Sequence, residues 1–246
     1  MIRTATALLA LAALVGACAL SDPAPTLPAP PIPTEAPTAT PEPTSPPTPT
    51  PVPVGVYVAP WLPSDLKTRL DTTLAALPND FYPVPDPSGA TVRVSYSAPA
   101  ALPALGRQVF AVVAAFPTVA DEATWAELEA SWKGAPEAQH GPLRMTQSTY
   151  AALSARLGEA APGAVEVLEA DRIVDALWAD RNAWGIVPFD ELDPRLKVLY
   201  VDGRSPLRRN LDLAAYPLVT DVVLSGDLNA AAKLHAAFGE AYTNRD

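Results

Sequence analysis

Residues 110–115 read Phe-Ala-Val-Val-Ala-Ala, an uninterrupted apolar run near the middle of a chain of 246 residues. A strand without alternating polar positions has no face for solvent, so this run predicts a strand that is buried on both faces. Shorter apolar or alternating segments predict further strands on either side of it. We expect these strands at residues 55–59, 91–96, 143–145, 164–168, 185–189, 197–201 and 218–224.

Helical patterns lie between many of these segments. Thr124 and Glu127 form a capping-box pattern, which is typical of a helix start, and Gly158 is typical of a helix end. The expected helices begin at Ser64, at Thr124, at Thr146 or Ser148, at Asp171 and at Asp227, and the last one carries Leu234, Phe238 and Tyr242. Alternating strands and helices predict a mostly parallel sheet with helices on both faces. Periodicity leaves open whether there is one sheet or two.

Charge and composition exclude several functions. The chain has 27 acidic and 17 basic residues, for a formal charge of −10, which argues against binding nucleic acid or anionic lipid. One cysteine cannot form an internal disulfide or a thiolate zinc site, and two histidines argue against a multi-histidine metal centre. No nucleophile-elbow or phosphate-loop motif is present. We therefore expect a protein that is not an enzyme and that needs no metal or cofactor.

The N-terminus has the pattern of a secretory signal. Arg3 is followed by an apolar run over residues 5–15, which is too short to span a membrane as a helix. Val15-Gly16-Ala17-Cys18 comes next and resembles a bacterial lipobox, in which the cysteine becomes the lipidated first residue. The sequence therefore predicts a signal peptide over residues 1–17 and a lipid on Cys18. That lipid would hold the protein at the extracytoplasmic face of the cell membrane.

A Pro/Thr-rich segment follows the cysteine. Residues 21–53 hold 14 of the 30 prolines and have almost no charge and no apolar periodicity. Such a segment cannot bury enough surface to offset its ordering entropy, and its prolines favour extended polyproline II. We expect residues 18–53 to form a disordered stalk that would reach roughly 100 Å if fully extended. The folded domain is then expected over residues 54–246.

Three segments resemble extracytoplasmic solute-binding proteins of the phosphate-binding type. Residues 116–128, followed by Trp132-Lys133-Gly134, are similar to that family's t-x-x-E-L … W-x-G segment. Residues 183–189, Ala-Trp-Gly-Ile-Val-Pro-Phe, are similar to its G-x-I-G-Y-V strand. Residues 201–206, followed by Tyr216-Pro217-Leu218, are similar to its v-d-G-x-x-P … Y-P-L segment.

The resemblance covers roughly residues 110–220 and implies a type II periplasmic-binding fold. In that α/β fold, two α/β lobes joined by two crossing segments enclose a cleft for the ligand. The family holds its anion at a Ser/Thr-rich turn that opens a helix, through backbone N–H groups and the helix dipole. The matching turn here lacks the family's glycine and reads Arg-Met-Thr-Gln-Ser-Thr over residues 144–149. The resemblance implies a ligand site made of Arg144, Thr146, Ser148 and Thr149, although the same hydroxyls also suit ordinary helix caps.

Two residues after expected strands are further candidates. Thr118 follows the central apolar run, where it could supply a hydroxyl to the cleft or belong to an ordinary turn. Trp61 follows the first expected strand, where either a cleft loop or a packed aromatic would suit the position.

A closer resemblance is to the N-terminal domain of large bacterial lipoproteins of the CapA type, which belong to capsule and poly-γ-glutamate synthesis. It rests on residues 186–190, 194–199 and 201–203 and on the C-terminal Thr-Asn-Arg-Asp of residues 243–246. A metallophosphatase-like domain follows in those proteins, and the two histidines of this chain cannot supply its metal site. The resemblance therefore implies that only the front module is present here.

Two functions follow from these observations. The first is a membrane-anchored binding module that captures a small solute, such as an anion, in an interlobe cleft and works with an ABC-type permease. The second is a non-catalytic accessory domain that interacts with a surface-polymer synthesis protein and has a vestigial cleft. A cleft lined by polar groups favours the first function, and a cleft filled by apolar side chains favours the second.

Overall fold

The structure is a computed structural model that describes residues 52–97, 102–135 and 140–245. The expected signal peptide, the lipidation site at Cys18 and nearly all of the expected stalk lie outside these residues. In the part of the chain that is described, no helix is long and apolar enough to cross a membrane.

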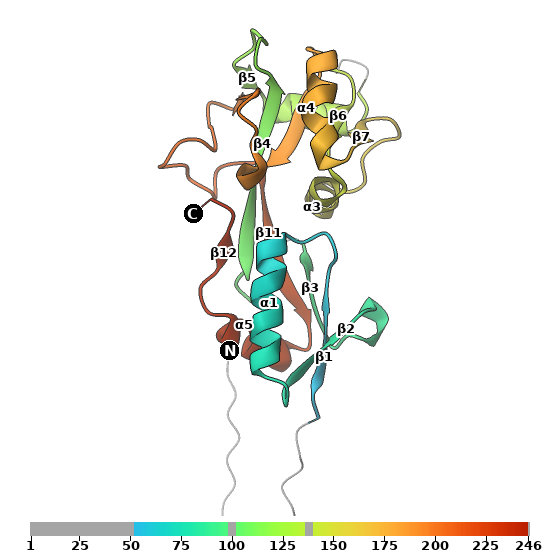
Figure 1. Cartoon of the computed structure of the whole chain (residues 1–246), viewed down its shortest axis with the longest axis vertical. Helices are drawn as coiled ribbons and strands as arrows, with labels where there is room; N and C mark the ends of the chain where they lie inside the picture. The colour runs from blue at the N-terminus through green and yellow to red at the C-terminus, as the bar shows by residue number, and fades with distance from the viewer. Residues whose placement is uncertain (1–51, 98–101, 136–139, 246) are drawn as a thin grey trace, which may run out of the picture. The chain divides into compact units, whose positions relative to one another are not determined.

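Strand β4 (Gly106–Ala115) connects two groups of elements, which we name the first and second lobes (Figure 1). Up to Val109 it pairs antiparallel with β11 (Val219–Gly226). From Phe110 onward it pairs antiparallel with β8 (Gly185–Pro188). One continuous strand therefore belongs to both lobes and changes its partner at its middle.

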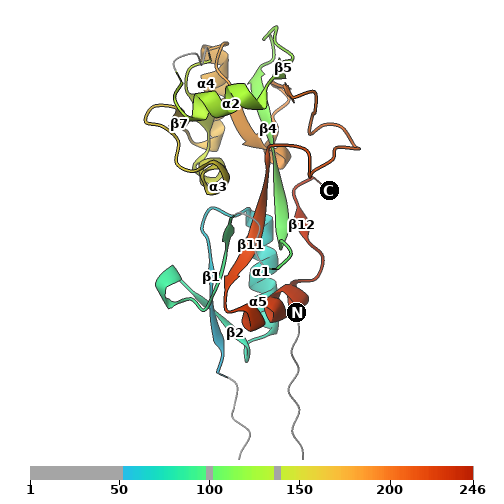
Figure 2. The same ribbon diagram turned by 180° about the vertical axis from the view of Figure 1, so that it is seen from behind.

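The first lobe is built around a sheet of order β2-β1-β3-β11-β4, in which β1 runs parallel to β2 and β3. Its elements besides β4 and β11 are β1 (Val54–Val58), α1 (Ser64–Ala76), β2 (Phe81–Val84), a 3₁₀ turn (Pro87–Gly89), β3 (Val92–Tyr96), α5 (Leu228–Phe238) and β12 (Tyr242–Thr243). β12 adds a short parallel pairing to the start of β4 (Figure 2).

The second lobe is built around the order β4-β8-β6-β7, in which β6 runs parallel to β7 and β8, and β9 pairs antiparallel with the end of β4. Its elements are α2 (Trp125–Trp132), β6 (Leu143–Met145), α3 (Gln147–Leu157), β7 (Val165–Val167), α4 (Ala170–Ala179), β8, a 3₁₀ turn η2 (Phe189–Glu191) and β9 (Leu196–Val198). A separate two-stranded sheet pairs β5 (Glu122–Ala123) with β10 (Tyr200–Val201).

The core explains why residues 110–115 are apolar without alternation. Phe110, Val112 and Ala114 belong to the larger apolar cluster, which also contains residues of α2 and α3. Ala111 and Val113 belong to a smaller cluster on the other face, with residues of α4. Helices therefore cover both faces of this strand, and the prediction of a doubly buried strand is confirmed.

Three local predictions differ from the structure. The sheet is mixed rather than mostly parallel, because β11 runs antiparallel to β3 and β4, and β4 runs antiparallel to β8 and β9. Helix α4 begins at Ala170, so Asp171 lies in its first turn and Glu169 occupies the cap position. Helix α5 ends at Phe238, and Tyr242 lies in β12 instead of on the last helix.

Candidate functional site

Two adjoining hollows lie where β6, β7 and β8 of the second lobe end. Their volumes are about 240 and 560 Å³, and both are lined by Thr146, Ala170 and Glu191. We name them together the interlobe pocket, because Trp61 of the first lobe lines the larger one. The carboxyl ends of parallel strands are where α/β proteins bind ligands, since helix N-termini and loop side chains meet there.

The N-terminus of α3 supplies one side of the pocket. The Thr146 hydroxyl caps the helix by accepting the backbone N–H of Thr149 at 3.4 Å, and it lies 2.9 Å from the Ser148 hydroxyl. The N–H groups of Gln147 and Ser148 have no acceptor within the helix, because the first turn of an α-helix lacks carbonyl partners. Both residues line the larger hollow, so the helix offers N–H and hydroxyl groups to it.

The N-terminus of α4 borders the same pocket. Glu169, Ala170 and Arg172 contribute to the larger hollow, and Asp171 to the smaller one. Two helix N-termini therefore face one space, and their dipoles favour negative charge there.

Carboxylates in the lining of the interlobe pocket oppose the preference of the helix dipoles for negative charge. The charged side chains that line the interlobe pocket are Glu169, Asp171, Arg172, Glu191, Asp193 and Arg195. Arg195 binds Asp193 through two contacts of 3.0 and 2.9 Å, so these two charges largely cancel. Partial burial, and then the nearby Asp190 carboxylate, raise the pKa of Glu191 above its usual value. These carboxylates would repel a dianion that carries no hydrogen-bond donor. The pocket therefore does not suit a purely anionic ligand.

Trp61 lines the larger hollow from the first lobe, and Tyr96 contacts its backbone. Trp61 is 46% exposed, and its backbone carbonyl lies 3.3 Å from the Tyr96 hydroxyl. The single hydrogen of that hydroxyl is shared between this carbonyl and the side-chain oxygen of the buried Gln108 on β4. Burial raises the pKa of Tyr96 well above its usual range, so this hydroxyl stays protonated and can donate. These bonds fix Trp61 relative to the strand that connects the lobes.

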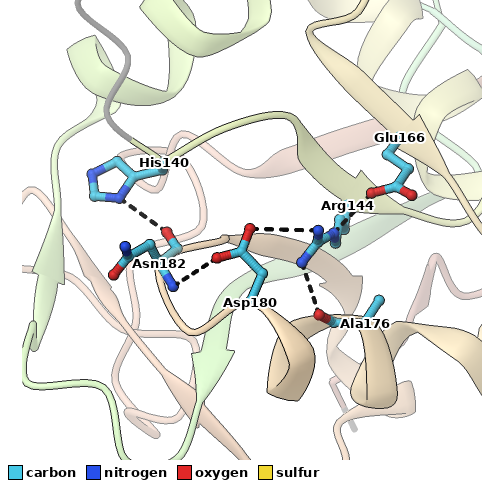
Figure 3. A network of polar contacts seen from close by, with 6 residues as sticks. All are labelled: His140, Arg144, Glu166, Ala176, Asp180 and Asn182. Carbon is cyan, nitrogen blue, oxygen red and sulfur yellow. Dashed lines mark hydrogen bonds and ion pairs between the residues drawn. The ribbon is translucent and has the colours of Figure 1, made fainter.

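Arg144 is part of a different network, which Figure 3 shows. Its guanidinium contacts the Glu166 carboxylate at 2.8 Å, the Ala176 carbonyl at 2.8 Å and the Asp180 carboxylate at 3.5 Å. The side chain is only 13% exposed. Arg144 thus ties β6 to β7 and to the C-terminal turn of α4, and it does not line the interlobe pocket.

Thr118 also lies away from the other candidates. Its hydroxyl donates to the Arg181 carbonyl at 3.3 Å, and its own carbonyl accepts the Lys197 ammonium at 2.9 Å. Because β4 and β8 are antiparallel, the end of β4 lies at the opposite edge of the sheet from the end of β8. The structure therefore brings Thr146 and Ser148 together beside the pocket, leaves Thr149 fully buried behind them, and separates Thr118 and Arg144 from them.

Several pocket residues escaped the sequence reasoning. Glu169 and Ala170 lie shortly after β7, and Glu191 lies in the 3₁₀ turn after β8, so each comes within three residues of the end of a strand whose carboxyl end meets the pocket. A position just after a strand could have identified these residues as pocket candidates from the sequence. It did not single them out, because acidic residues at such positions are also common on ordinary protein surfaces.

Among the described residues, no group of three or more His, Cys, Asp or Glu side chains is placed to hold a metal ion. The His140 ring stacks on Trp184 with centroids 3.6 Å apart, and its Nδ1 lies 3.3 Å from the Asn182 carbonyl.

Comparisons with known proteins concern the fold. No protein-family model matches the sequence, and no curated protein matches it. An ABC-type phosphate transport receptor from Vibrio cholerae superposes with a TM-score of 0.58 at 13% identity, over 76% of this chain and 93% of that chain.

Two other solved structures agree. A possible phosphate binding protein from Planctomyces limnophilus has a TM-score of 0.51 at 12% identity, over 70% of this chain and 80% of its own. PstS from Borrelia burgdorferi has a TM-score of 0.51 at 9% identity, over 75% and 91%. The chain therefore has the fold of the type II periplasmic binding proteins, with two α/β lobes joined by crossing strands.

Proposed function

We propose that this protein is a non-enzymatic binding module that captures a small polar solute in its interlobe pocket. The observation that carries the proposal is the convergence of the α3 and α4 N-termini, the turn after β8 and the half-exposed Trp61 on one space. Pockets of about 300 to 1,000 Å³ with a few polar groups suit small molecules, and the larger hollow measures about 560 Å³.

The charges suggest what kind of solute would fit. The N–H and hydroxyl groups at the start of α3 would bind an acceptor or an anionic group. The carboxylates of Glu169 and Glu191 would bind hydroxyl or ammonium donors from the same molecule. A solute with both kinds of group, such as a sugar acid or an amino acid, satisfies both sides of the pocket better than inorganic phosphate does.

The lining also bears on the accessory-domain alternative. A vestigial cleft would be filled by apolar side chains, whereas the larger hollow is open and its lining mixes Thr146, Gln147, Ser148 and charged residues with Trp61, Val167, Leu168 and Ala170. The polar groups in this mixed lining support the binding function.

We further propose that the module is anchored through a lipid on Cys18 at the extracytoplasmic face of the membrane and delivers its solute to an ABC-type permease. The support is the signal-like N-terminus with its lipobox-like Val15-Gly16-Ala17-Cys18 and the Pro/Thr-rich stalk.

Metabolic labelling with a tritiated fatty acid tests the anchor, and a C18S variant should lose the label.

A thermal-shift screen of the full chain tests the binding function. The panel contains inorganic phosphate, sulfate, amino acids, sugar acids and neutral sugars. A solute that binds only the folded state raises Tm, by roughly 5–10 °C when it is present at a hundred times its Kd. The sugar acids or amino acids should contain the solute with the largest shift. If no member of the panel shifts Tm, the proposal loses its basis.

A further inference from the structure

A buried side-chain amide lies directly after β12. Asn244 is 8% exposed and directly follows β12. Its Oδ1 accepts the backbone N–H of Val109 at 2.8 Å, and its Nδ2 donates to the carbonyl of the same residue at 3.1 Å. One side-chain amide therefore satisfies both backbone groups of one residue in the crossing strand β4.

Val109 is the position at which β4 changes lobes. It is the last residue of β4 that pairs with β11, and the next residue pairs with β8. A change of lobe orientation must rotate the backbone near this point, because the two halves of the strand are fixed in different sheets. Two hydrogen bonds from one buried side chain restrict that rotation.

The same amide reaches the second lobe. Asn244 Nδ2 donates its other hydrogen to the Asp190 carboxylate at 2.7 Å. Asp190 lies in η2, and the next residue, Glu191, lines both hollows of the interlobe pocket. A hydrogen bond to a carboxylate is stronger than one between neutral groups.

The neighbouring residues hold the segment against β4. Tyr242 pairs with Gly106, and a Cβ on that glycine would lie 2.8 Å from the Tyr242 Cβ. On the other side, the Arg245 guanidinium donates to the Pro206 carbonyl at 3.0 Å and lies over the Phe189 ring at 5.6 Å. Asn244 is thus positioned by contacts on both sides of it.

We propose that Asn244 is a positioning residue that fixes the crossing strand at its lobe boundary and holds the Asp190–Glu191 turn at the pocket. The role in ligand binding rests on the proposed function, because it assumes that the interlobe pocket is the binding site. The tie between Asn244, Val109 and Asp190 does not depend on a ligand and is tested without one.

Hydrogen–deuterium exchange of the ligand-free full chain tests the tie. N244A removes the hydrogen bonds to Val109 and Asp190 and should speed exchange roughly tenfold in residues 185–192 and 109–113, a change that corresponds to about 1.4 kcal/mol. Residues 54–58 of β1, which β3 and β11 separate from β4, should keep their wild-type rates. N229A is the matched control, because Asn229 is an exposed asparagine on α5, and it should leave residues 185–192 unchanged.

A reciprocal exchange of the two side chains separates positioning from a general loss of stability. N244D should speed exchange in residues 189–192, because two carboxylates then face each other. The N244D/D190N double variant restores the bond between the two side chains in reversed order but leaves the Val109 carbonyl without its donor, so rates in residues 189–192 should fall back toward wild type while residues 109–113 stay fast. Wild-type rates in N244A, or a double variant that exchanges as fast as N244D in residues 189–192, would overturn the proposal. A failed solute screen would leave both exchange results standing and would remove only the binding role.

Discussion

At the scale of single residues, Arg144 and Thr146 show how neighbours in sequence come to different roles. The Arg144 guanidinium is bound by Glu166, the Ala176 carbonyl and Asp180, so it holds β7 and the end of α4 against β6. Thr146 lies beyond the end of β6, caps α3 and borders both hollows. A sequence pattern that places both in one ligand turn cannot tell which side chain is already occupied by protein partners.

Replacement of Arg144 should therefore affect stability without affecting binding. R144M should lower the free energy of unfolding by about 1–3 kcal/mol, because a largely buried guanidinium loses charged hydrogen bonds. The solute-induced shift in Tm should stay at its wild-type size. R204M is the matched control at an exposed position and should change stability by less than about 0.5 kcal/mol. Urea denaturation measures both, and a lost Tm shift in R144M would place Arg144 in the site after all.

Glu191 and Glu127 should give opposite pH dependences. The pKa of Glu191 is raised from 4.5, so its ionisation favours the unfolded chain, and stability falls as pH rises from 4.5 through the folded-state pKa. The pKa of Glu127 is lowered by hydrogen bonds from the Thr124 backbone and hydroxyl, so its contribution is present above 4.5 and is lost as pH falls through the folded-state pKa.

Urea unfolding from about pH 3 to pH 8 measures this difference. E191Q should gain stability relative to wild type as pH rises, whereas E127Q should lose stability relative to wild type over the same rise. Parallel curves for the two variants would contradict the assignment of these environments.

At the scale of elements, β4 and β12 show what a local pattern predicts and what it misses. The apolar run of β4 and the capping box of α2 are local signals, and both appear in the structure where the sequence places them. β12 has no such signal, because a strand of two residues is formed by its pairing with β4 rather than by its own propensity. Tyr242 has helical spacing from Phe238, yet Gly239, with φ of 83°, ends the helix before it.

Gly106 is the element-scale test of that pairing. G106A should lower the free energy of unfolding by about 1–3 kcal/mol, because the new methyl group meets both the Tyr242 Cβ at 2.8 Å and its carbonyl at 2.9 Å. G89A is the matched control, since a Cβ on Gly89 meets nothing within 4 Å. Thermal unfolding of the two variants should differ clearly, and equal Tm values would show that β12 is free to move away from β4.

At the scale of the whole molecule, the alternation of strands and helices predicted an α/β protein, and the resemblance implied the two lobes that the structure contains. The pocket was predicted only in part. Thr146, Ser148 and Trp61 were candidates, but Glu169, Ala170 and Glu191 join them through contacts between distant segments. Sequence spacing carries no information about contacts between distant segments. For the same reason, the sequence could not show that Thr118 lies at the opposite end of the sheet from Thr146 and Ser148.

We propose that the solute binds at the α3 N-terminus inside the interlobe pocket. Isothermal titration of the panel member with the largest Tm shift tests it in wild type, T146V and T118V. T146V removes a hydroxyl that borders both hollows and should weaken binding roughly tenfold, whereas T118V removes a hydroxyl outside the pocket and should leave Kd unchanged. Equal Kd values for wild type and T146V, or weaker binding in T118V, would contradict this placement of the site.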